Sequence, residues 1–142
     1  MDIKRFKNME VRYFPDEEIL ILRKVKAQLF IRFDSIGILD QAHADLSKIQ
    51  DIWLKYRPLL PPGAEPDNVK FIQLDDNVNF FDENNERLSD CTPFQARGTF
   101  SLLLVVRGIT KRVDGDGKYK LIIRVKQVKM EESKIEDAVC QL

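Results

Sequence analysis

Histidine, cysteine and long apolar runs are scarce in this chain of 142 residues, and each shortage excludes something. His43 is the only histidine, and Cys91 and Cys140 stand far apart in no spacing typical of a metal site. No apolar run approaches the roughly 18–20 residues of a membrane-spanning helix, so we expect no membrane partner. The first residues lack the apolar region of a secretion signal, which predicts an intracellular protein of the cytoplasm or nucleus, with free thiols.

Signatures of catalysis are missing as well. No serine or cysteine lies in a nucleophile motif, and the sequence has no phosphate-loop, dinucleotide-binding or zinc-protease motif. The acidic residues at 75–76 and 82–83 could hold a divalent ion, but the asparagines among them are more typical of a solvated turn. The Asp-Gly-Asp-Gly turn at 114–117 lacks the ligand pattern of a calcium loop. We therefore expect a non-enzymatic protein without metal or cofactor.

The charges that are present balance overall, but they are distributed unevenly along the chain. Lys and Arg number 23, as do Asp and Glu, which gives a formal net charge of zero. Residues 91–130 hold nine Lys and Arg against two Asp, a net charge of +7, and residues 1–33 carry +3. Residues 34–90 carry −7 and residues 131–142 carry −3. Such sign asymmetry is typical of proteins that contact nucleic acid or another anionic surface.

The spacing of apolar residues predicts several strands and one helix. Residues 23–33, 97–107 and 118–130 alternate apolar and polar side chains, as half-buried strands do. Residues 4–14 are predicted as a strand or an arm that ends at Pro15, and residues 69–74 as a strand that 78–81 continue or pair with. One helix, with Asp40 as a candidate N-cap, is predicted to end near Pro58. Its apolar stripe consists of Leu39, Ala42, Leu46, Ile49, Ile52, Trp53 and Tyr56.

This order of elements predicts a β-rich α+β fold. We expect a small antiparallel barrel or curved sheet, OB-like, with one packed helix. An open α+β sheet and a small sandwich are the alternatives. The sequence predicts one domain over residues 1–130, followed by an acidic C-terminal tail over residues 131–142.

Two predicted strands place cations on the face opposite their apolar face. If both lie in one sheet in the matching sense, their outer faces form one basic platform, which favours phosphate contact; a solvated face that uses lysine to protect a sheet edge is the alternative. Lys111 and Arg112, just before the turn, are candidates for a phosphate clamp or for an ordinary polar turn. Phe30, on the basic face, either stacks on a base or packs under a loop, and Tyr13 is a second stacking candidate. The cationic candidates on the two strands are Lys24, Lys26, Arg32, Lys118, Lys120, Arg124 and Lys126.

With this architecture and an acidic tail that ends in apolar residues, the chain resembles single-stranded-DNA-binding proteins of the OB type. The resemblance implies that the tail recruits partner proteins and competes with nucleic acid for the basic groove. We predict non-enzymatic binding of single-stranded nucleic acid, preferably DNA, by electrostatic capture and aromatic stacking. The alternative is a protein-interaction or assembly module whose basic face docks on an acidic partner. That partner could be the acidic 34–90 region of another copy, which would make the protein a homo-oligomer.

Overall fold

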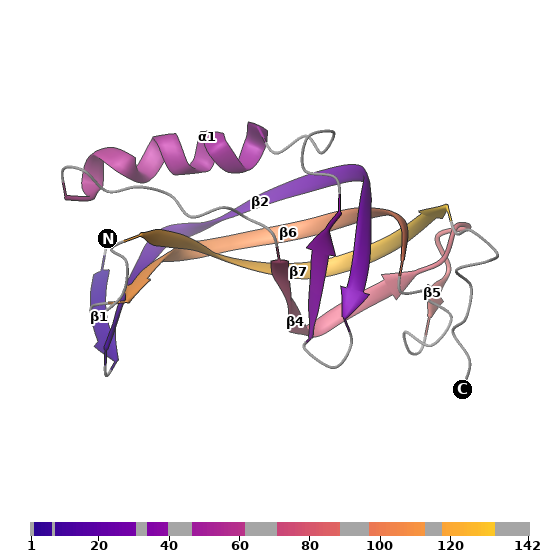
Figure 1. Ribbon diagram of the computed structural model, residues 1–142, viewed down its shortest axis with the longest axis horizontal. Coiled ribbons are helices and arrows are strands. Elements are labelled where there is room, and N and C mark those ends of the chain that lie inside the picture. The colour runs from indigo at the N-terminus through magenta and orange to yellow at the C-terminus, as the bar shows by residue number, and fades with distance from the viewer. Residues whose placement is uncertain are drawn as a thin grey trace.

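The structure, a computed structural model, is rich in strands, and its described residues contain one short α-helix (Figure 1). It describes residues 2–6, 8–30, 34–39, 47–61, 71–88, 97–112 and 118–132. The helix, α1, spans Ser47–Tyr56 and continues into a short 3₁₀ helix, Arg57–Leu59. The strands are β1 (Asp2–Phe6), β2 (Met9–Phe30), β3 (Ser35–Ile38), β4 (Phe71–Phe81), β5 (Arg87–Leu88), β6 (Arg97–Arg112) and β7 (Tyr119–Glu132).

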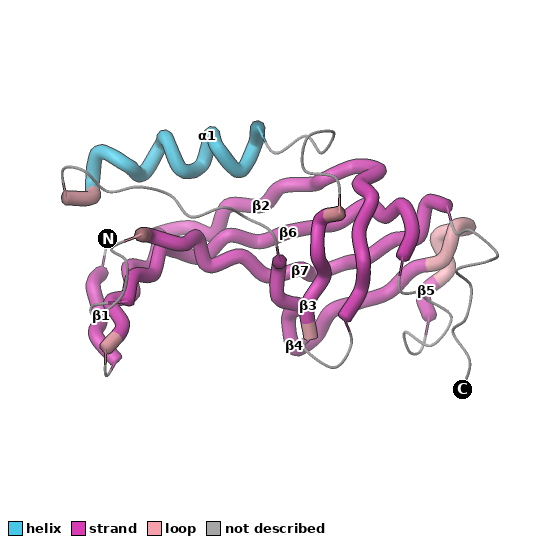
Figure 2. The backbone as a smooth tube through the Cα atoms, viewed as in Figure 1, coloured by secondary structure: helices cyan, strands magenta, loops and turns pink. Residues whose placement is uncertain are grey.

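Five of the strands close into a ring. The pairing order runs β2-β3-β4-β7-β6, and β6 pairs again with β2 (Figure 2). All neighbours in the ring are antiparallel except β4 and β7, which run parallel. β1 adds to the start of β2, and β5 adds to the end of β4. Within the described residues, a small barrel-like sheet with one helix is therefore confirmed, but the sheet is not wholly antiparallel, because β4 and β7 run parallel.

The core fills the ring because the long strands bury alternate side chains. On β6, Phe100, Leu102, Leu104 and Val106 are fully buried, which is the face that the sequence pattern predicts. On β7 and β2 the inward residues are Ile123, Val125, Val128, Val25, Ala27 and Leu29. We call the opposite side of the ring the outer face.

α1 covers the part of the sheet formed by the first half of β2, the end of β6 and the start of β7 (Figure 1). Ile49, Ile52, Trp53 and Tyr56 are its buried residues, which confirms that part of the predicted stripe. The ring of Tyr56 stacks on buried Phe14, with centroids 3.7 Å apart and planes 8° from parallel. Phe14 is therefore a core residue that anchors the helix.

Two sequence predictions about element boundaries are wrong, and one strand was not predicted. Leu39 is not in the helix: it follows β3, and its backbone N–H donates to the carbonyl of Lys26 over 2.9 Å. β3 itself was not predicted, because four residues are too few to show a period of two. β2 does not end at Pro15 but runs through it, since the ladder between β2 and β6 is interrupted from Tyr13 to Glu18 and no N–H is required there.

Asp40, Ala42, His43 and Leu46 of the predicted helix lie outside the described residues. So do the Asp-Gly-Asp-Gly turn and residues 133–142 of the acidic tail.

Candidate nucleic-acid interface

The two basic strands of the sequence analysis, β2 and β7, are not neighbours. β6 lies between them, and each pairs with it at a different end. Lys26 of β2 is opposite Thr99, whereas Lys120 of β7 is opposite Thr110. These two β6 positions are about 36 Å apart along an extended strand. The condition for one shared platform is therefore not met, and the predicted cations form separate groups.

The cations of β7 do lie on the outer face, as their parity predicts. Lys118 and Lys120 are exposed, and Arg124 and Lys126 are half-buried, while Tyr119 and Ile123 between them are buried. Arg124 donates from Nη1 to the carbonyl of its neighbour Ile123 over 2.9 Å.

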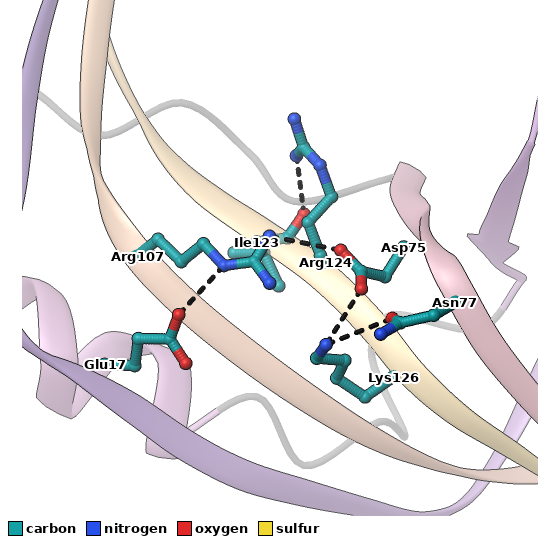
Figure 3. A network of polar contacts seen from close by, with 7 residues as sticks. All are labelled: Glu17, Asp75, Asn77, Arg107, Ile123, Arg124 and Lys126. Atoms are coloured by element: carbon teal, nitrogen blue, oxygen red, sulfur yellow. Dashed lines mark hydrogen bonds and ion pairs between the residues drawn. The ribbon is translucent and has the colours of Figure 1, made fainter.

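Carboxylates from other strands reach into the middle of this face (Figure 3). Asp75 of β4 accepts hydrogen bonds from Lys126 at 2.9 Å and from Arg107 at 3.1 Å, and Glu17 of β2 lies 3.1 Å from Arg107. Lys126 also donates to the Oδ1 atom of Asn77 over 3.1 Å. The hydrogen bond from Lys126, followed by the contacts with Arg107, lowers the pKa of Asp75. Lys126 is therefore engaged by the protein's own acid, so this part of the outer face is not the purely basic platform that the sequence predicts.

The cations of β2 lie in a different environment. Lys24 and Lys26 are exposed, and within the described part of the chain neither forms an ion pair. Lys24 occupies a bulge with a positive φ of 53°, and its N–H donates to Oγ of Ser101 over 3.2 Å. Arg97 at the start of β6 is exposed and lies diagonally across from Lys26, because Gln28 is its direct partner. Within the described residues, Lys26 and Arg97 thus form a cationic group without an ion pair on the outer face, while Glu131 of β7 accepts a hydrogen bond from Ser101 on the same face.

Next to this group, two aromatic rings lie on the outer face. Phe71 of β4 is 64% exposed, although it is a large apolar side chain on a sheet. Its ring meets Phe30 of β2 edge to face, with centroids 5.8 Å apart and planes at 63°. A Cβ atom at Gly37 of β3, which lies between the two strands, would come within 3.1 Å of both rings. The glycine therefore provides the space for them; we call Phe30, Gly37 and Phe71 the aromatic platform.

Strand register places the cations on both sides of this platform. One row of directly paired residues crosses the outer face from β6 to β4 as Arg97, Gln28, Gly37 and Phe71. The adjacent row runs from β2 to β7 as Phe30, Ser35, Gln73 and Arg124. The face thus combines exposed π-surface with cations at two edges, a combination that proteins use to bind single-stranded nucleic acids.

The remaining candidates lie elsewhere or outside the described residues. Lys111 has its Nζ atom 5.3 Å from the ring centroid of buried Tyr119, near the far end of the β6–β7 hairpin. Tyr13 is 40% exposed on β2, with Lys4 5.8 Å from its ring centroid. Arg32 and the side chain of Arg112 are not described.

Sequence reasoning missed Phe71, Arg97 and Asp75 as residues of this surface. For Phe71 a signal was available: residues 69–74 carry apolar side chains on both faces, and one face of a strand in a small barrel is open to solvent. For Asp75 and Arg97 no local signal exists, because their roles depend on which strands become neighbours.

Comparison of the chain with protein-family models, with curated proteins and with solved structures found no match. Among the described residues, no helix has the length and apolarity to cross a membrane. In the same residues, no three side chains of the His, Cys, Asp or Glu type gather in a way that could hold a metal ion. Function has to be inferred from the chemistry of the site.

Proposed function

We propose that the protein binds single-stranded nucleic acid, without catalysis, on the outer face formed by β2, β3 and β4. The observation that carries this proposal is the exposed ring of Phe71 in the aromatic platform, with Lys26 and Arg97 beside it. A ring that is 64% exposed is available to a base, and stacking of a base on an aromatic side chain contributes about 1–3 kcal/mol.

The order of strands supports an OB-like assignment of the barrel. In chain order, the five ring strands are β2, β3, β4, β6 and β7, so the aromatic platform lies mainly on the second and third of them. OB folds are five-stranded Greek-key barrels that bind oligonucleotides on the face of their second and third strands. The position of Phe71 on β4, over Gly37 of β3, agrees with that use of the fold.

The cations supply the electrostatic part of the binding. Lys26, Arg97 and Arg124 flank the aromatic platform and can each neutralise one phosphate. Three such contacts predict that log K falls with log[salt] at a slope of roughly −2 on a single strand. A preference for DNA rests on the OB analogy alone, since no residue of the platform is placed to read a 2′-hydroxyl.

The proposal is tested by fluorescence anisotropy with a labelled single-stranded oligonucleotide of about 20 nucleotides, titrated at several salt concentrations. We expect binding at low salt with the slope given above, and strong weakening in Lys26→Glu with Arg97→Glu. A matched control reverses two exposed cations away from the platform, Lys48→Glu with Arg57→Glu, and should bind almost as well as the wild type.

Two results would count against the proposal. One is no binding at low salt with micromolar protein; the other is equal weakening by both double variants, which would mean that only net charge matters. If light scattering then found a defined assembly, the protein-interaction alternative would replace nucleic-acid binding.

A further inference from the structure

A hollow of about 300 Å³ opens on the outer face, away from the aromatic platform and over β4, β7, β6 and the middle of β2. Its floor is apolar: Leu103 and Val105 of β6 lie opposite Ile21 and Ile19 of β2 in the ladder. Ile19, which is 69% exposed, forms part of its wall. Val105 is buried, so the apolar surface that the hollow offers comes mainly from Ile19 and half-buried Leu103.

The rim of the hollow carries side-chain amides. Asn79 of β4 and Gln127 of β7 are direct partners in the parallel ladder, and Asn77 lies two residues before Asn79. Each amide offers donors and an acceptor in one plane. Since Lys126 donates to the Oδ1 atom of Asn77, the two N–H donors of that amide remain.

The charged groups at the hollow compensate one another. Lys126 pairs with Asp75, and Glu17 pairs with Arg107. A phosphate would find no free cation among the described lining residues, and Glu17 would repel it. The hollow therefore suits a neutral group with an apolar face and a polar edge.

We propose that this hollow takes one nucleobase of the bound strand and reads its edge through Asn79 and Gln127. This inference rests on the proposed function and adds base selectivity to it. Phe71 and Asn79 are about 26 Å apart along β4, so one strand of several nucleotides can reach both. Stacking on the aromatic platform tolerates any base, whereas planar amides discriminate between base edges.

The experiment measures anisotropy with labelled homopolymers (dA, dC and dT) of about 20 nucleotides at one salt concentration. For the wild type we expect the most tightly and the most weakly bound homopolymer to differ about tenfold or more in Kd. This is the size of discrimination that amide contacts to a base edge provide. The variant Asn79→Leu with Gln127→Leu puts apolar side chains of comparable size at both positions and removes the hydrogen bonds. In this variant the Kd values of the homopolymers should differ by no more than about threefold. The Kd of the homopolymer that the wild type binds most weakly should stay unchanged. Gln50→Leu, on the exposed side of α1, is the matched control and should keep the preference.

The outcomes separate the two proposals. Tight binding of all homopolymers by the wild type with equal Kd overturns the base-reading inference and leaves the proposed function intact. A preference that survives in the double variant also overturns it. Absence of binding to every homopolymer overturns the proposed function, and the inference with it. The wild-type series needs no variant, so the inference is testable even if the double variant does not fold.

Discussion

Replacing Phe71 by alanine should separate binding from stability. In the folded chain about a third of this side chain is covered, so the lost burial is about 1 kcal/mol, a third of the value for a fully buried phenylalanine. Loss of the edge-to-face contact with Phe30 adds roughly 0.5–1.5 kcal/mol. The variant should therefore stay folded, with a free energy of unfolding lower by about 1–2 kcal/mol.

The effect of Phe71→Ala on binding should be of a similar size but appear in a different measurement. Removing one stacking surface costs about 1–3 kcal/mol of binding free energy, which is about a 5- to 150-fold increase in Kd. Anisotropy with a labelled single-stranded oligonucleotide measures this increase, and urea unfolding measures the stability. An aromatic replacement, Phe71→Trp, should restore the affinity because it restores the π-surface.

Two controls make the result decisive. Leu54→Ala removes another exposed apolar side chain, on α1, and should leave Kd unchanged. Phe14→Ala empties a core position stacked on Tyr56 and should cost about 3–5 kcal/mol of stability. If Phe71→Ala binds within twofold of the wild type while remaining folded, the aromatic platform is not the binding surface and the reasoning fails.

The other predictions concern backbone spacing, a charged clamp and one phosphate contact. Gly108→Ala should lower stability by about 1–3 kcal/mol in urea unfolding, because its Cβ would lie 2.2 Å from the carbonyl oxygen of Arg12. Hydrogen bonds from Lys55 and Tyr56 lower the pKa of Glu18, so the ionised form of Glu18 stabilises the fold. The stability advantage of the wild type over Glu18→Gln should be complete above the ordinary Glu pKa of 4.5 and disappear as pH falls through the lowered value; an advantage that persists at pH 2–3 would contradict the linkage. Arg124→Gln should make the salt slope of oligonucleotide binding less steep by about 0.7, and an unchanged slope would remove Arg124 from the interface.

The faces of the long strands could be predicted from the sequence because each strand separates the core from the outer face. Leu102 and Leu104 on β6, and Ile123 and Val125 on β7, are buried as a period of two requires. The same pattern correctly placed Lys120 on the outer face. In such strands one face is buried and the other is solvated, so the local sequence alternates between apolar and polar residues.

The short and irregular parts could not be predicted in the same way. Ile36 and Ile38 of β3 are buried, but two apolar residues do not define a period, and Leu39 after them matches the spacing of the helix. Pro15 lies within β2 because a gap in the ladder accommodates it, and such a gap depends on the partner strand. These features are decided by tertiary pairing and have no local signature.

The site illustrates the same limit for charge. The net charge of +7 in residues 91–130 counts every cation equally, although some of these cations are ion-paired in the fold and others are not. Asp75 and Glu17, from β4 and β2, hold Arg107 and Lys126 in place, so these cations organise the outer face and contribute little free charge. Lys26 and Arg97 make no ion pair within the described residues and lie beside the exposed aromatic ring. Phosphate affinity should therefore depend more on these two cations than on the longer basic series of β7, even though β7 carries the larger charge.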